Sequence, residues 1–322
     1  MPKTKVAYFT HFRQNVIDLV VGMAPKDFEV IGKANSISEG EKIEIAKDAD
    51  FLMLHGGKLS EQLLRTATRV KMLQLLSAGF DNVDLPLMKE LGIPVSNVGG
   101  ANRQGVAEMA ITLMLGVYRR LVAMDEGVRA GKWLEQLSTG FDTFELNGKT
   151  VGIVGFGRIG QMVAKYLRGF ENTILYYDVV AYPDAEKEYK AKRVSLDELL
   201  RQSDIVTIHV PLLEENYGLI GERELGLMKP TAVLVNTSRG PVVDEKALIA
   251  ALKAGKIRGA GLDVFEQEPI NKDNPLLKLK NVVLTPHAAG GTYDSWPRRA
   301  QFAYENMQRV LRGEKPQSVV QE

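Results

Sequence analysis

The sequence has 322 residues, of which 45% are hydrophobic and 25% charged; this is ordinary for a soluble globular protein and long enough for about two domains. Its net charge of +1 argues against nucleic acid or an anionic membrane as the main partner, and its lack of cysteine excludes disulfides, thiolate nucleophiles and cysteine metal sites. It shows neither a signal-peptide pattern nor an apolar stretch of membrane-spanning length, so we expect a cytoplasmic protein.

Short apolar runs alternate with helical patterns over the first third of the chain. The runs that predict buried strands are Lys5–Phe9, Phe28–Ile31, Phe51–Leu54, Met72–Leu75 and Pro94–Ser96. Helical stretches between them include Leu59–Thr66 and Leu85–Leu91. Strands that alternate with helices predict a parallel sheet covered on both faces.

The next part of the chain is helical and then irregular. A helix is predicted from Arg103 to Leu121, and the apolar side chains around most of its surface indicate burial between domains or subunits. The aromatic segment 127–146 follows without a clear period. We interpret it either as a loop packed on its own domain or as a dimerisation arm.

Strands and helices resume at Thr150. The predicted strands are Val151–Val154, Ile174–Tyr177, Ile205–His209, Ala232–Asn236, Gly259–Asp263 and Val282–Thr285. Among the helices between them, Val243–Ala254 has Asp244 as a candidate N-cap and Gly255 as a stop signal. Six strands with crossover helices match a dinucleotide-binding fold, and an amphipathic helix follows them from about residue 295 to 312.

A glycine fingerprint joins the first of these later strands to a helix. Gly155 permits a sharp turn, Gly157 lets the backbone approach a pyrophosphate, and Gly160 lets the helix pack close to the strand. The helix that opens at Arg158 and Ile159 points its N–H groups and the positive end of its dipole at the phosphates. The pattern predicts a dinucleotide site.

A carboxylate ends the strand after the fingerprint. Asp178 lies 18 residues past Gly160, a spacing at which a carboxylate accepts the ribose hydroxyls of adenosine and repels a 2′-phosphate. We therefore predict NAD as the cofactor, with NADP disfavoured. The alternative is an ordinary turn aspartate at a strand end.

Three ionisable side chains of different kinds follow the carboxyl ends of later strands, where ligands bind in a doubly wound sheet. Arg239 could hold a substrate carboxylate through a bidentate fork, or it could be a solvated loop residue. His287 could exchange a proton with a hydroxyl group, or it could be a core histidine. Glu268 could bond the other imidazole nitrogen and set its tautomer, with neighbouring Glu266 as a competitor.

Two further strand-end residues have open interpretations. Asp263 could accept a hydrogen bond from a nicotinamide carboxamide, or it could cap a turn. His209 is a candidate for lining the cofactor, although packing at a strand end is the commoner role. The acidic residues are scattered, so no metal site is predicted.

Six segments, spread in order over nearly the whole chain, carry a resemblance to one family. They are 78–84 (AGFDNVD), 106–108 (VAE), 155–160 (GFGRIG), 236–240 (NTSRG), 261–269 (GLDVFEQEP) and 285–290 (TPHAAG). With these segments the sequence resembles the D-isomer-specific 2-hydroxyacid dehydrogenases. The resemblance implies an NAD-dependent enzyme that transfers a hydride between nicotinamide C4 and C2 of a 2-hydroxy or 2-oxo acid.

The resemblance also implies an architecture of two doubly wound parallel-sheet α/β domains. A Rossmann coenzyme domain, residues 101–290, would be inserted in a split flavodoxin-like substrate domain, residues 1–100 plus 291–322. A homodimer would form through the coenzyme domain, with a dimerisation arm at about 118–147.

The resemblance assigns the catalytic triad to Arg239, Glu268 and His287, because Glu268 rather than Glu266 matches the family's Glu-Pro position. Ala78 and Gly79 would join Arg239 in binding the substrate. The full set predicted to bind the cofactor is Val106, Gly155, Gly157, Arg158, Ile159, Gly160, Asp178, His209, Val210, Pro211, Thr237, Ser238, Asp263 and Gly290.

Two other functions fit the same sequence. One is a phosphite- or formate-type dehydrogenase on the same scaffold, and the other is a non-catalytic NAD-sensing scaffold of corepressor type. The intact triad favours the enzyme over the sensor. Among substrates we favour a small 2-oxo acid such as glyoxylate or hydroxypyruvate, with its side chain recognised near His55, Lys58, Phe80 and Trp296.

Overall fold

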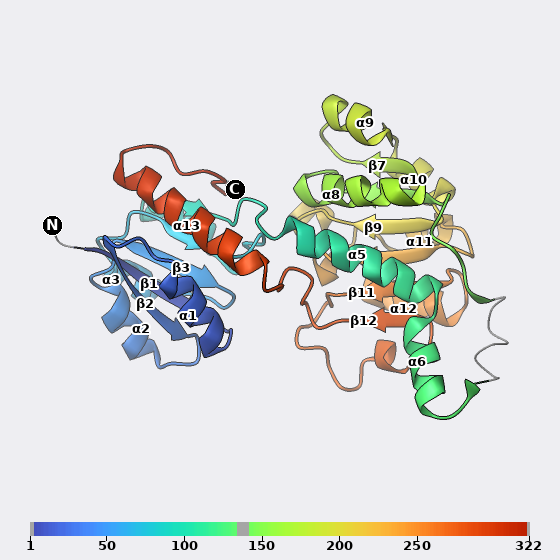
Figure 1. The fold of residues 1–322 in the computed structure, drawn as a ribbon, viewed down its shortest axis with the longest axis horizontal. Helices are drawn as coiled ribbons and strands as arrows, with labels where there is room; N and C mark the ends of the chain where they lie inside the picture. The colour runs from blue at the N-terminus through green and yellow to red at the C-terminus, as the bar shows by residue number, and fades with distance from the viewer. Residues whose placement is uncertain (1–2, 134–141, 321–322) are drawn as a thin grey trace. The chain divides into compact units, whose positions relative to one another are not determined.

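The computed structural model describes residues 3–133 and 142–320. The chain divides into two compact units, each built around one parallel sheet (Figure 1). Unit 1 comprises Met1–Asn102 and Gly291–Glu322, and unit 2 comprises Arg103–Gly290. The α/β prediction with two parallel sheets is confirmed.

The sheet of unit 1 has the strand order β2-β1-β3-β4-β5, which is the flavodoxin-like order. Its strands are β1 (Thr4–Thr10), β2 (Phe28–Ala34), β3 (Phe51–His55), β4 (Leu73–Leu75) and β5 (Val95–Ser96). Its helices are α1 (Gln14–Gly22), α2 (Glu39–Ala46), α3 (Glu61–Thr66), α4 (Leu85–Glu90) and α13 (Ser295–Leu311).

Alternate residues of β1 supply the cores on the two faces of this sheet. Val6 and Tyr8 pack into the cluster that contains the apolar side of α13, while Ala7 and Phe9 pack into the cluster on the opposite face. The period of two along a strand thus produces two buried layers, and near-continuous apolar strands are what a sheet covered on both faces requires.

The carboxyl-terminal segment belongs to unit 1 because α13 lies against the first sheet (Figure 1). Buried Asn306 donates to Gln74 Oε1 and to Ser96 Oγ, both at 2.8 Å. Val319 then pairs with Ser96 as an antiparallel bridge beside β5. These contacts join residues more than two hundred positions apart.

The sheet of unit 2 has the order β12-β11-β10-β9-β6-β7-β8, with the reversal of strand order between β6 and β9. Its strands are β6 (Thr150–Val154), β7 (Thr173–Tyr177), β8 (Ala191–Arg193), β9 (Ile205–Ile208), β10 (Val233–Asn236), β11 (Gly259–Leu262) and β12 (Val282–Leu284). The sequence predicted six strands and missed β8, because its three residues are mostly polar and lie at the edge of the sheet.

The helices of unit 2 cover both faces of its sheet (Figure 1). They are α5 (Arg103–Tyr118), α6 (Leu121–Arg129), α8 (Arg158–Leu167), α9 (Pro183–Tyr189), α10 (Leu196–Gln202), α11 (Glu222–Leu227) and α12 (Glu245–Lys253). As predicted, Asp244 caps α12 by accepting the N–H of Ala247, and Gly255 follows the helix with φ +65°.

The prediction of one helix from Arg103 to Leu121 is wrong at its end. Arg120 has left-handed backbone angles, φ 50° and ψ 38°, so α5 stops at Tyr118 and α6 starts at Leu121. Part of the segment predicted to be irregular is therefore helical. The centre of that segment, 134–141, lies outside the described residues.

Within 3–133 and 142–320, no helix is both long enough and apolar enough to cross a membrane.

Candidate active site

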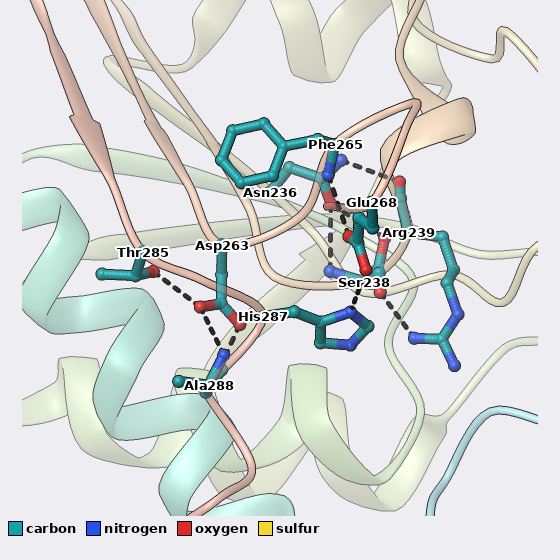
Figure 2. Close-up of polar contacts among 10 residues, drawn as sticks. Asn236, Ser238, Arg239, Asp263, Phe265, Glu268, Thr285, His287 and Ala288 are labelled. Carbon is teal, nitrogen blue, oxygen red and sulfur yellow. Dashed lines mark hydrogen bonds and ion pairs between the residues drawn. The ribbon is translucent and has the colours of Figure 1, made fainter. Parts of the chain in front are cut away.

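A histidine and a glutamate are joined by a hydrogen bond at the carboxyl edge of the sheet of unit 2 (Figure 2). His287 follows β12 and Glu268 lies in the loop after β11, and Nδ1 of the imidazole is 2.7 Å from Oε2 of the carboxylate. Arg239, which follows β10, lies in the same group of side chains (Figure 2). The structure therefore brings together the three residues that the sequence singled out.

His287 has a backbone conformation that is unusual for its residue type. Its φ of +51° lies in the left-handed region, which costs free energy in a residue with a side chain. Its N–H donates to the Asp263 carbonyl at 2.7 Å and to the Thr285 carbonyl at 3.1 Å. Because Nδ1 faces Glu268, Nε2 is the ring nitrogen that can exchange a proton with a ligand.

Asp263 holds the loop that carries His287. Its side chain is completely buried, and Oδ1 accepts the Thr285 hydroxyl at 2.6 Å and the Ala288 N–H at 2.9 Å, while Oδ2 accepts the Ala289 N–H at 2.8 Å (Figure 2). This is the turn-capping alternative of the sequence analysis. A contact between Asp263 and a nicotinamide carboxamide stays a prediction.

The electrostatic surroundings of Glu268 favour its charged form. Burial pushes the pKa of this carboxyl upward, but the His287 hydrogen bond and charge, the Phe265 N–H at 3.0 Å and the Arg239 charge together hold the pKa below its usual range. The imidazole contacts Glu268 rather than its competitor Glu266, whose backbone N–H donates to Glu245. The partner of His287 is therefore Glu268.

Asn236 shapes the loop of Arg239, a role that the sequence analysis missed. Its side chain is 1% exposed; Oδ1 accepts both the N–H and the hydroxyl of Ser238 at 3.0 Å, and Nδ2 donates to the Arg239 carbonyl at 2.9 Å (Figure 2). An Asn at the end of a buried strand with Ser two residues later is typical of such a side-chain-closed turn, and it was the available signal.

The glycine fingerprint forms the turn between β6 and α8. Gly155 has φ +93°, and a Cβ there would lie 2.8 Å from the carbonyl carbon of His209 and the nitrogen of Val210. A Cβ on Gly160 would lie 2.2 Å from the Gly155 carbonyl oxygen. Gly157 is the N-cap of α8, and apart from Gly157 and its two chain neighbours no heavy atom of the described residues lies within 4 Å of a Cβ built there.

Asp178 lies directly against this turn. Its Oδ2 accepts the N–H of Phe156 at 2.6 Å, and its Oδ1 accepts the N–H of Val180 at 3.0 Å. The carboxylate therefore joins the end of β7 to the glycine turn. Arg193 of β8 approaches the same place and donates to the Asp178 carbonyl at 2.9 Å.

His209 is neutral and held by hydroxyl groups. Its Nε2 lies 2.9 Å from Thr207 Oγ1 and its Nδ1 lies 3.5 Å from Thr237 Oγ1. Burial lowers the pKa of His209 to about 3, so the imidazole carries no charge at neutral pH. Val210 and Pro211 follow His209 in the chain, and the backbone nitrogen of Val210 lies beside Gly155 of the glycine turn.

The other predicted residues are distributed over both units. Val106 is buried in α5, and Gly290 ends unit 2. Ala78 and Gly79 belong to unit 1, where their carbonyl groups accept from Asn97 Nδ2 at 3.1 Å and from Ser77 Oγ at 2.8 Å. Over the described residues, no group of three or more His, Asp or Glu side chains could hold a metal ion.

A Rossmann-type sheet with a glycine turn at its first strand and an Arg, Glu and His group at its carboxyl edge defines a dinucleotide-dependent oxidoreductase. The model of the "D-isomer specific 2-hydroxyacid dehydrogenase, NAD binding domain" matches residues 111–289. The chain belongs to the D-isomer specific 2-hydroxyacid dehydrogenase family, as its motifs predicted.

Several known proteins are similar to this chain over most of its length. The glyoxylate reductase of Korarchaeum cryptofilum is 46% identical over 86% of this chain and 84% of its own length. The glyoxylate/hydroxypyruvate reductase B of Yersinia pestis is 38% identical over 86% and 85%. The holo form of Rhodotorula graminis D-mandelate dehydrogenase superposes with a TM-score of 0.87 at 30% identity, covering 100% of this chain and 99% of that one. The protein is thus an NAD(H)-dependent oxidoreductase that interconverts 2-hydroxy and 2-oxo acids.

Proposed function

We propose that this enzyme reduces small 2-oxo acids of the glyoxylate and hydroxypyruvate type, with NADH as the preferred cofactor. The observation that carries the proposal is the His287–Glu268 pair, 2.7 Å long, at the same sheet edge as Arg239. The names of the Korarchaeum and Yersinia relatives support the substrate class.

The three side chains have complementary roles in this proposal. Arg239 binds the substrate carboxylate through its guanidinium fork. In reduction, His287 donates the proton on Nε2 to the carbonyl oxygen of the substrate; in oxidation it removes the same proton from the hydroxyl group. Glu268 stabilises the charged imidazole through Nδ1 and orients its ring.

The residues of the glycine turn fit a dinucleotide. The absence of a side chain at Gly157, next to the uncapped N–H groups of α8, leaves room for a pyrophosphate at the positive end of the helix. The bound nicotinamide supplies the hydride. Asp178, fixed by two backbone N–H groups, is the residue that we expect to accept the adenosine ribose and to disfavour NADP.

The units have different roles in the proposal. Unit 2 binds the coenzyme and unit 1 contributes to substrate binding. We propose further that two copies form a homodimer through the arm around 118–147. Its described part supports this, because Leu121 and Trp133 have exposed fractions of 59% and 62%, large values for apolar side chains of an isolated chain.

Absorbance of the reduced cofactor tests the proposed function. We expect glyoxylate and hydroxypyruvate to oxidise NADH faster than NADPH, and an Asp178→Ser variant to shift the NADPH/NADH ratio of kcat/KM upward by about tenfold or more, since it removes the carboxylate that repels a 2′-phosphate. An Asp184→Ser variant in exposed α9 is the control. No turnover with any small 2-oxo acid would refute the substrate class, and an unchanged ratio would refute the role of Asp178.

A further inference from the structure

The buried amide of Asn236 forms its described hydrogen bonds within its own turn, and that turn carries Arg239. We propose that Asn236 is a positioning residue that sets the direction of the Arg239 guanidinium and couples it to the Glu268–His287 pair. The inference rests on the proposed role of Arg239 as the group that binds the substrate carboxylate.

The amide of Asn236 uses both of its ends on the turn. Its Oδ1 accepts two bonds from Ser238, and its Nδ2 donates to the carbonyl of Arg239 at 2.9 Å. The backbone of Asn236 is fixed in turn by the sheet, because its carbonyl accepts the N–H of Asp263 at 2.9 Å. The Cα of Arg239 therefore stands at a place determined by a buried side chain of β10.

Only an amide satisfies this turn. At this position the chain requires one acceptor for the Ser238 N–H and hydroxyl, and one donor for the Arg239 carbonyl. Aspartate keeps the acceptor but places a second oxygen against that carbonyl, and alanine provides neither group. Because Asn236 is 1% exposed, water cannot replace the lost bonds without opening the turn.

The turn of Arg239 also lies against the loop that leads to Glu268. Gly240 follows Arg239, and a Cβ at Gly240 would lie 1.9 Å from the carbonyl carbon and oxygen of Phe265. The N–H of Phe265 donates to Glu268 Oε1, and Glu268 Oε2 contacts His287 (Figure 2). A single contact at Gly240 therefore joins the backbone that carries the carboxylate-binding group to the backbone that orients the acid–base pair.

Steady-state kinetics of the full-length enzyme tests the inference, with Asn236→Asp and Asn236→Ala as variants. Asn172→Asp is the control, because the amide Nδ2 of Asn172 also donates to backbone carbonyls, in its case those of Leu146 and Lys149, ahead of β7. Arg239→Lys is measured in parallel as the test of the carboxylate-binding role. The readouts are KM and kcat for glyoxylate, the Kd of NADH by fluorescence, and the melting midpoint.

We expect both Asn236 variants to raise the KM for glyoxylate about tenfold or more, because a displacement of about 1 Å at a binding group can cost about a hundredfold. The Kd of NADH should rise by less than the KM does, since the glycine turn is untouched and only Thr237 and Ser238 of the predicted cofactor set lie in the altered turn. Asn172→Asp should lower the melting midpoint to a similar extent and leave KM unchanged, which separates positioning from general destabilisation.

Two results overturn the inference, and they are distinguishable from failure of the proposed function. If Arg239→Lys raises KM and the Asn236 variants change KM no more than Asn172→Asp does, Asn236 does not position Arg239. If the Asn236 variants weaken NADH binding as strongly as substrate binding, the residue supports the fold rather than the guanidinium. If Arg239→Lys itself leaves KM unchanged, the carboxylate-binding role is wrong and the inference falls with it.

Discussion

The two units place the same residue types at the two ends of corresponding strands. In unit 1, Asp50 precedes β3 and His55 ends it; in unit 2, Asp204 precedes β9 and His209 follows it. Both strands lie beside the first strand of their own sheet, β1 or β6. Features that both units share belong to the parallel-sheet scaffold, and features of unit 2 alone are candidates for the chemistry.

The amino ends of the two strands are built alike. Asp50 accepts a backbone N–H of β1 at 3.0 Å and Lys71 Nζ at 2.8 Å. Asp204 accepts a backbone N–H of β6 at 3.0 Å and Lys229 Nζ at 2.8 Å. In both units the carboxylate thus fixes the register of two neighbouring strands at the edge away from the proposed chemistry.

The carboxyl ends of the two strands differ. His55 receives a hydrogen bond from the Arg299 guanidinium at 2.9 Å and packs against the Trp296 ring, whereas both nitrogens of His209 face threonine hydroxyls. The sheet of unit 2 also continues through β10, β11 and β12, whose ends carry the triad. The two sheets are therefore alike at the amino ends of these strands, and the proposed site lies at the carboxyl edge of the sheet of unit 2.

The largest effect that we expect follows from removing the proposed acid–base group at the carboxyl edge of the sheet of unit 2. His287→Ala removes the proposed proton donor, so kcat for glyoxylate reduction should fall by at least about a hundredfold. The Kd of NADH should stay within about threefold of the wild-type value. Stopped-flow and steady-state assays check this, and near-normal turnover in the variant would show that another group transfers the proton.

A smaller effect is expected when the carboxylate partner is neutralised. Glu268→Gln keeps the shape of the side chain but removes the charge that stabilises the protonated imidazole, so the pH above which reduction declines should move downward. The rate should fall by about tenfold or more at the alkaline end of the profile and by much less at its acidic end.

The pH profile of kcat/KM for glyoxylate reduction measures this shift. Glu266→Gln is the matched control, because Glu266 is exposed and lies two residues away. An identical displacement of both profiles would mean that general surface charge, rather than the pair with His287, sets the limb.

The sequence predicted those features of the fold and site that depend on local patterns. Apolar runs located most strands, and the glycine spacing located the turn at Gly155. The short edge strand β8 was missed because it has no apolar run, and the break at Arg120 was missed because an arginine, rather than a Gly or Asn, adopts the left-handed angles there. The side-chain hydrogen bonds of Asn236 depend on how its turn folds, and the hydrophobic periodicity of the sequence does not show this.

The smallest expected effect concerns the amino ends of β3 and β9, where the two units are built alike. Asp50→Asn and Asp204→Asn each replace a charged acceptor by an amide, and each should cost about 1.5–3 kcal/mol of the free energy of unfolding, the usual worth of hydrogen bonds to charged groups. That corresponds to a fall of several degrees in the melting midpoint of the unit concerned. KM and kcat per folded molecule should stay at the wild-type values, since neither residue belongs to the proposed site.

The pH dependence of stability sharpens the same test. Burial pushes the pKa of Asp50 and of Asp204 upward, but the lysine and the backbone N–H that each carboxylate binds hold both pKa values below the usual range. The stabilisation is therefore complete above the unfolded-state pKa of about 3.9 and disappears as the pH falls through the lower folded-state value. The difference in melting midpoint between wild type and each Asn variant should be full at pH 7 and shrink below about pH 4. A difference that persists unchanged into acid would mean that shape, and not the charge, holds the two strands together.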